Sequence, residues 1–165
     1  MIDQLVIKIA TLGLLGIRLR APGTFGSLAG ILTVACLVGV FEIHIWIIAL
    51  GFTPLFLLGI PICTKAEKIL GKNDPGCVIW DEFCVIPYLF IFIPDAVGKS
   101  SSSDFFLWNL IAFATFRFFD VLKPLGIKKL QNIPRGAGVM LDDLAAAFIS
   151  AIVLLLIKTF PLSFQ

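Results

Sequence analysis

Two pairs of adjacent acidic residues are the part of this sequence best suited to chemistry. Asp81-Glu82 and Asp142-Asp143 each stand at the start of an apolar run, and Asp120 follows another such run. Carboxylates brought together repel one another, and a divalent cation removes that repulsion. Mg²⁺ prefers hard oxygen ligands and leaves positions for water and a substrate phosphate. These acids therefore predict a Mg²⁺ site with Asp81, Glu82, Asp142 and Asp143 as ligands. We expect these four residues and Asp120 to be catalytic, and the sequence does not assign the base or the nucleophile among them.

Basic and hydroxyl side chains near the acids are suited to binding phosphate. Arg117 and Lys123 lie three residues before and after Asp120, and Arg117 and Asp120 share one helix face. Both cations can form charge-assisted hydrogen bonds to phosphate oxygens. The segment Arg20-Ala-Pro-Gly-Thr-Phe-Gly-Ser27 adds Arg20, Thr24 and Ser27 at a turn before a helix, where backbone N–H groups favour anions. We therefore expect these five residues to bind the substrate.

Structural roles for the same residues are the alternative. Ser27 is a favourable N-cap for the first apolar helix, with the preceding glycines making the turn. Each acid pair is suited to the N-terminus of a helix, where the macrodipole favours negative charge. Arg117 and Asp120 also form an ion pair at i,i+3 spacing. The gathering of both acid pairs with Asp120 and Asp74 in a chain of only 11 acids favours the functional interpretation.

The sequence excludes several nucleophiles. His44 is the only histidine, and it lies between apolar runs away from the acids, which argues against a Ser-His-Asp arrangement. None of the four cysteines is followed six residues later by arginine, so the loop of cysteine phosphatases is absent. Metal-assisted attack by water remains the simplest chemistry, and an aspartyl nucleophile stays open.

The composition indicates a membrane protein. Fifty-nine per cent of the 165 residues are hydrophobic and 15% are charged, whereas about 25% is usual for the charged share. The mean hydropathy is +1.03. Such a thin polar coat excludes a soluble monomer, and the 16 phenylalanines exclude disorder. The net charge of +2 argues neither for nor against a nucleic-acid partner. No run of five or more like charges forms a basic arm, and no nucleic-acid partner is expected. The sequence leaves the oligomeric state undefined.

Hydrophobic runs define the elements that must position these residues. An amphipathic N-terminal segment predicts a helix lying in the membrane interface. The chain is then expected to form one all-α domain over residues 1–165, a small polytopic bundle of four to five membrane helices, two of them short or re-entrant. The apolar runs are Leu28–Phe41, Ile45–Cys63, Phe83–Pro94, Phe105–Phe116 and Leu144–Ile157.

Basic residues indicate the orientation of this bundle. Segments 1–27, 64–82 and 117–143 together carry eleven of the 13 lysines and arginines. The positive-inside rule places such segments in the cytoplasm. The same segments carry the candidate site, so we expect its open face to be cytoplasmic.

Four blocks of the sequence resemble the signature blocks of the phosphatidylglycerophosphatase A family. The resemblance runs from about residue 18 to about 160, with the blocks in the family's order and spacing. It implies an all-helical, Mg²⁺-dependent enzyme of the bacterial inner membrane. Its reaction would be hydrolysis of the terminal phosphomonoester of phosphatidylglycerophosphate to phosphatidylglycerol. Val85 and Arg135 stand where the family commonly has glycine. The blocks are Arg20-Ala-Pro-Gly-Thr-Phe-Gly-Ser27, Asp74-Pro-Gly-Cys-Val-Ile-Trp-Asp-Glu-Phe83, Phe116-Arg-Phe-Phe-Asp-Val-Leu-Lys-Pro124 and Gly138-Val-Met-Leu-Asp-Asp143.

Two other functions fit part of the pattern. A CDP-alcohol phosphatidyltransferase is another Mg²⁺-dependent membrane phosphotransfer enzyme, but its D-x2-D-G-x2-A-R signature is absent. A small channel or transporter with structural charges would carry acids midway along its membrane helices. Here the acids are expected at the helix ends, on one side, which favours the enzyme.

Overall fold

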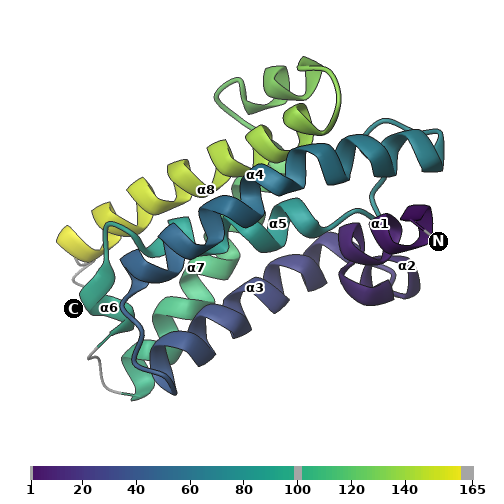
Figure 1. The fold of residues 1–165 in the computed structure, drawn as a ribbon. Coiled ribbons are helices and arrows are strands. Elements are labelled where there is room, and N and C mark those ends of the chain that lie inside the picture. Colours follow the sequence, from purple (N-terminus) through teal and green to yellow (C-terminus); the bar gives the residue numbers. More distant parts are fainter. Residues whose placement is uncertain (1, 99–101, 161–165) are drawn as a thin grey trace.

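Four long helices form the frame of the molecule. The computed structural model describes residues 2–98 and 102–160, and these ranges contain helices and no strands. Each of the four helices is long and apolar enough to span a membrane, which confirms the predicted all-α polytopic fold. They run side by side in Figure 1 and are α3 (Pro22–Gly39), α4 (Ile45–Leu70), α7 (Ser102–Leu122) and α8 (Gly136–Thr159).

The helices extend further toward the candidate site than the apolar runs do. α3 begins at Pro22, because proline at the first helical position lacks only an N–H that would be unpaired anyway. α8 begins at Gly136, six residues before Asp142. The run Phe105–Phe116 is the middle of the full-length helix α7. Polar residues close to the ends of the spans are therefore held on rigid helices.

A short, interrupted segment occupies the centre of the bundle. It consists of α5 (Trp80–Val85), the 3₁₀ helix η2 (Ile86–Phe90) and α6 (Pro94–Val97). α5 packs against α3, α4 and α8, and η2 contacts the same three helices. The side chains of Cys84, Val85 and Ile86 are completely buried. This segment is surrounded by protein, in contrast to the four long helices, whose surfaces are largely exposed.

The interrupted segment passes from one end of the bundle to the other. At its start, Ile79 donates a backbone hydrogen bond to Ala10 of the N-terminal region, at 2.9 Å. At its end, Pro94 and Val97 line a pocket with the α3–α4 connection. The first of the two short runs therefore traverses the bundle inside the protein. Of the connection between α6 and α7 that follows, residues 99–101 lie outside the described residues.

The N-terminal region covers the end of the bundle at which α5 begins. α1 (Ile2–Ala10) packs against α4, and Asp3 forms an ion pair with Lys65 at 3.0 Å. η1 (Leu12–Leu14) and α2 (Leu15–Arg18) then lead to α3. The predicted N-terminal helix is therefore present, and its position in the membrane interface stays a prediction. At the same end, η3 (Ile127–Asn132) connects α7 to α8.

Candidate active site

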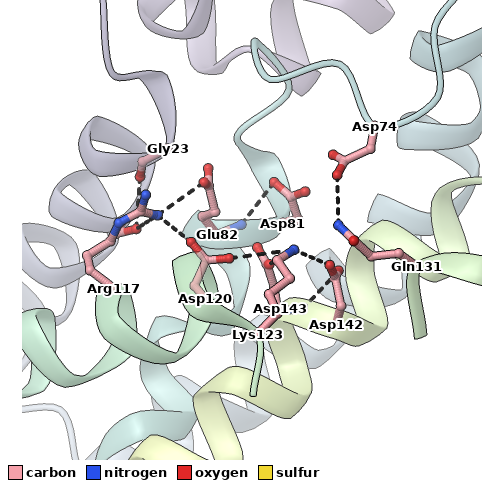
Figure 2. Close-up of polar contacts among 11 residues, drawn as sticks. Gly23, Asp74, Asp81, Glu82, Arg117, Asp120, Lys123, Gln131, Asp142 and Asp143 are labelled. Atoms are coloured by element: carbon pink, nitrogen blue, oxygen red, sulfur yellow. Dashed lines mark hydrogen bonds and ion pairs between the residues drawn. The ribbon is translucent and has the colours of Figure 1, made fainter. Parts of the chain in front are cut away.

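Three elements bring the predicted acids into one pocket. α5 supplies Asp81 and Glu82, α7 supplies Asp120, and α8 supplies Asp142 and Asp143. All five line a cavity of about 280 Å³, together with Lys123, Asp74 and Gln131. Asp81, Asp120, Asp142 and Asp143 are all buried. Figure 2 shows their carboxylates converging from the three elements, as the sequence predicted.

Arg117 connects the acids of α5 and α7. Its Nη1 donates to Asp120 Oδ2 at 2.6 Å and to Glu82 Oε1 at 3.3 Å. The same nitrogen donates to the hydroxyl of Ser27 on α3, also at 3.3 Å. The guanidinium is therefore more than the i,i+3 partner of Asp120, because it ties three elements together (Figure 2).

Lys123 connects the acids of α7 and α8. Its ammonium group forms a short ion pair with Asp142 Oδ2, and it lies 3.8 Å from Asp120 Oδ1 and 4.0 Å from Asp143 Oδ1. Asp120 thus lies between Arg117 and Lys123 and contacts both. The two cations and four of the five carboxylates form one ionic network, in which Asp81 takes no part.

Two residues lining the pocket hold an uncommon backbone conformation. Lys123 and Asp74 both have a φ of 45°, and each directly precedes a proline. Positive φ is uncommon outside glycine, and such conformations cost of order 1–3 kcal/mol. The surrounding contacts must hold them. For Asp74 these contacts are a hydrogen bond from Gln131 Nε2 to Oδ2, at 3.0 Å, and one from its own N–H to Glu67 Oε1, at 2.9 Å.

Helix capping accounts for few of these residues. Ser27 lies inside α3, and its hydroxyl donates to the carbonyl of Gly23 at 2.8 Å, so the interpretation of Ser27 as an N-cap is wrong. Asp142 and Asp143 lie in the second turn of α8, beyond capping positions. Asp81 and Glu82 do occupy the first turn of α5, where the helix dipole favours them.

Glycines on α3 leave room for the Glu82 carboxylate. A Cβ at Gly23 would lie 1.9 Å from Glu82 Oε1, and one at Gly26 would lie 2.9 Å from Glu82 Oε2. Both distances are shorter than van der Waals contact, so the Glu82 carboxylate can hold this position only with glycine at these two positions. The sequence predicted a turn at these glycines, whereas the structure places them in a helix that packs against the site.

Burial changes the acid–base properties of the groups outside the long helices. Desolvation raises the pKa of Asp81, and the neighbouring Glu82 carboxylate raises it further. Desolvation and the charge of Asp120 raise the pKa of Glu82 to about 8, against the opposing effect of Arg117. Burial alone would lower the pKa of Lys123, but the Asp143, Asp142 and Asp120 carboxylates outweigh it and raise that pKa. The pocket therefore holds an acid, Glu82, whose pKa is raised to about 8, and a lysine whose protonated form the neighbouring carboxylates favour.

Two carboxylate oxygens are the best evidence that a cation fits this pocket. Within the described residues, Glu82 Oε2 and Asp143 Oδ2 are buried and have no hydrogen-bond partner. Unpaired buried oxygens are costly, and a bound ion would satisfy them. No group of three His, Cys, Asp or Glu side chains in the described part of the chain is already arranged to hold a metal ion. Four of the five acids instead pair with Arg117 or Lys123, and the oxygen donors suit Mg²⁺ by type.

The remaining predicted residues are placed less closely. Arg20 is exposed and takes part in no ion pair within residues 2–98 and 102–160, while Thr24 is half-buried in the first turn of α3. Gln131 was missed, because a lone glutamine in a 3₁₀ helix carries no sequence signal. His44 caps α4 at the opposite end of the bundle, so it is remote from the acids, as predicted.

Together the fold and the pocket define a small polytopic helical membrane protein with a buried ionic site at one end. Residues 8–158 match the model of a protein family described as Phosphatidylglycerophosphatase A. The chain belongs to the phosphatidylglycerophosphatase A family and is a phosphatase. No solved structure matches it.

Three relatives cover most of the chain. It is 39% identical over 140 residues to a protein of Haemophilus influenzae named phosphatidylglycerophosphatase A, covering 84% of this chain and 79% of that protein. It is 29% identical over 138 residues to the Escherichia coli protein of the same name, covering 82% and 73%. It is 36% identical over 137 residues to a Bacteroides thetaiotaomicron protein named putative phosphatidylinositol-3-phosphatase, covering 81% of each.

Proposed function

We propose that this protein hydrolyses the terminal phosphomonoester of phosphatidylglycerophosphate, giving phosphatidylglycerol and inorganic phosphate. Membership of the family and the names of two relatives support this substrate. The observation that carries the proposal is the network in which Arg117 and Lys123 pair with four of the five carboxylates of one pocket. Cations are needed to bind and stabilise the dianionic phosphomonoester. Attack of water on its phosphorus also needs groups that accept and donate protons.

In this reaction the attacking oxygen of water forms a bond to phosphorus while the bond from phosphorus to the glycerol oxygen breaks. Arg117 and Lys123 bind the non-bridging oxygens and stabilise the charge that develops on them. The carboxylates orient the water and accept its proton, and the glycerol oxygen leaves with a proton. Ser27 and Asp120 position the guanidinium, because both contact Arg117 Nη1.

We propose that Mg²⁺ binds in this pocket. Asp81, Glu82, Asp142 and Asp143 would hold it, and the unpaired Glu82 Oε2 and Asp143 Oδ2 are the oxygens with free lone pairs. When bound, Mg²⁺ supplies Lewis-acid activation of the phosphate and lowers the pKa of a bound water. With the acids holding Mg²⁺, Lys123 would no longer be needed to balance their charge, and its ammonium group could turn to the phosphate.

A second candidate substrate is a phosphoinositide. The Bacteroides thetaiotaomicron relative is named for such a lipid, and it is 36% identical to this chain. The two substrates share a phosphomonoester on a diacylglycerol-based lipid and differ in the alcohol that leaves. The pocket residues argued above contact the phosphate, so they do not distinguish between the two alcohols.

Phosphate release by the purified protein in detergent tests both candidates. The expected result is Mg²⁺-dependent release from phosphatidylglycerophosphate, loss of release with EDTA, and kcat/KM at least about tenfold lower for phosphatidylinositol 3-phosphate. Asp143→Asn in the same preparation controls for contaminating phosphatases. A higher kcat/KM for phosphatidylinositol 3-phosphate would make the phosphoinositide the substrate instead. No phosphate release from either lipid would refute the proposal.

We also propose a location in the bacterial inner membrane with the pocket open to the cytoplasm. The three basic segments identified in the sequence all lie at the end of the bundle that carries the pocket. This asymmetry is what the positive-inside rule requires.

A further inference from the structure

A second cavity opens between α4 and the start of α8. Its volume is about 810 Å³, and it shares no lining residue with the active-site pocket. One part of its lining is apolar and the other part is basic. The residues are Ile60, Pro61 and Ala137 on the apolar part, and Lys65, Lys68 and Arg135 on the basic part. We refer to it as the basic groove.

The residues that line the basic groove include no acid that could pair with its cations. Lys65 pairs with Asp3 of α1, in an ion pair with exposed side chains. Lys68 and Arg135, by contrast, have no carboxylate within 4.0 Å anywhere in the described ranges 2–98 and 102–160. The groove therefore has two unpaired cations, in contrast to the active site, where both cations are paired.

The two unpaired cations come from different elements that are fixed against each other. Lys68 lies on α4, and Arg135 directly precedes α8. At the junction, the backbone N–H of Gly136 donates to Thr64 Oγ1 at 3.0 Å. A Cβ at position 136 would lie 2.5 Å from the backbone nitrogen of Thr64, so the approach requires glycine. Arg135 itself has a φ of 70°, a conformation that the junction must hold.

The groove lies where α4 changes from apolar to polar. The helix is apolar from Ile45 to Cys63, and its last two turns carry Lys65 and Lys68. In a membrane protein, such a change marks the level at which the hydrocarbon core meets the headgroups. An apolar wall below this level and cations at this level match the two parts of a phospholipid. Zwitterionic lipids carry their own cation, so the two unpaired cations favour a lipid with net negative charge.

We propose that the basic groove binds one anionic phospholipid of the surrounding bilayer. Its phosphodiester lies on Lys68 and Arg135, and an acyl chain lies along Ile60 and Pro61. This site is separate from the catalytic pocket, and it does not depend on which lipid the enzyme hydrolyses.

Binding of phosphatidylglycerol with a fluorescent acyl chain, measured by anisotropy on the full chain in detergent, tests the proposal. The double variant Lys68→Gln/Arg135→Gln should weaken binding about tenfold or more, because two charge-assisted hydrogen bonds are lost. The matched variant Lys128→Gln/Lys129→Gln removes two exposed cations at the same end that do not line the groove. It should change the affinity by less than about threefold, given the small effect of exposed charges.

Competition separates the groove from other sources of binding. Unlabelled phosphatidylglycerol should displace the probe, whereas phosphatidylcholine and inorganic phosphate should not. If both double variants weakened probe binding equally, the binding would depend on general surface charge and not on the groove, which would overturn the proposal. Displacement by inorganic phosphate would place the probe in the catalytic pocket and overturn it as well. Unchanged unfolding temperatures of both variants exclude misfolding as the cause of weaker binding.

Discussion

The carboxylate of Glu82 lies directly against the backbone of Gly23, although the two residues are on different helices. A Cβ at position 23 would lie 1.9 Å from Glu82 Oε1, 2.9 Å from its Cδ and 3.1 Å from Arg117 Nη1. Because Gly23 has a hydrogen atom where other residues have a Cβ, α3 leaves room for the Glu82 carboxylate and the Arg117 guanidinium. Helix α3, which carries Gly23, therefore lies directly beside the ionic network.

Replacing Gly23 by alanine should move Glu82 and Arg117 without unfolding the protein, because the clashing atoms belong to the ends of flexible side chains. We expect kcat/KM to fall about tenfold or more, since misplaced catalytic groups lose rate steeply. Gly51→Ala is the matched control, because a Cβ at that position meets nothing within 4 Å. Equal activity of the two variants in a phosphate-release assay would contradict the close approach.

Replacing Asp81, Asp142 or Asp143 by asparagine should abolish or strongly reduce turnover. Each change removes a charged oxygen ligand of the proposed Mg²⁺ while preserving the shape of the side chain. The variants should still fold, because relief of repulsion among buried carboxylates offsets lost contacts. Asp95→Asn, at the opposite end of the bundle, serves as the control. Near-normal activity in two of the three site variants would refute the metal assignment.

Arg117→Lys should lower kcat/KM by about tenfold or more. Lysine keeps the charge, but its shorter side chain places the ammonium group away from the position at which Arg117 Nη1 contacts Asp120, Glu82 and Ser27. It also lacks the planar fork that can bind two phosphate oxygens at once. One lost charge-assisted hydrogen bond is worth about 1.5–3 kcal/mol. The Mg²⁺ concentration for half-maximal activity should change little. An exposed control, Arg18→Lys, should behave as the wild type, and an Arg117→Lys enzyme with full kcat/KM would assign Arg117 a purely structural role.

Binding of Mg²⁺ should strengthen as the pH rises from 6.5 to 8.5. The pKa of Glu82 is raised to about 8 and that of Asp81 is raised as well, so both carry protons more often at the lower pH. A metal ion must displace these protons, and one such proton weakens binding up to about tenfold per unit below the pKa. Titration of activity with Mg²⁺ at several pH values measures the effect. Glu82→Gln should flatten the dependence, and a wild-type affinity independent of pH would exclude Glu82 as a ligand.

Single cysteines introduced at positions 72 and 128 should be protected from impermeant reagents added outside intact cells. Both positions are exposed and lie in basic segments at the end that carries the pocket. A cysteine at position 42, in the α3–α4 connection at the other end, should be labelled. The background must lack native cysteines, because Cys36 is exposed. Labelling at 72 and 128 with protection at 42 would reverse the topology.

The sequence predicted the number and type of the elements well, because hydrophobic runs of membrane length carry a strong signal. It also predicted which acids converge, since Asp81, Asp120 and Asp142 all lie at ends of apolar segments that must align in a bundle. Ion-pair partners depend on rotation of each helix about its axis. Hydropathy does not define this rotation, so the sequence did not predict that Lys123 forms an ion pair with Asp142.

The glycines and the interrupted segment show what a one-dimensional pattern leaves open. By intrinsic propensity, Gly23 and Gly26 favour a turn. In the structure Pro22 instead begins helix α3, and the two glycines, which lack side chains, leave room for Glu82 of α5. The run from Phe83 to Pro94 has the composition of a short membrane helix, but most of it is buried in protein and its middle part, Ile86–Phe90, is a 3₁₀ helix. Propensity was overridden in both places by contacts between elements distant in the chain.

The broken path of residues 80–97 constrains how the protein reaches its native state during biogenesis. Backbone groups left unpaired by its irregular stretches would be costly in lipid, so this segment cannot be stable in the hydrocarbon core alone. The long helices on both sides can each insert independently. The segment must therefore be enclosed as they associate, and the carboxylates at its start join those of α7 and α8 only in that last step.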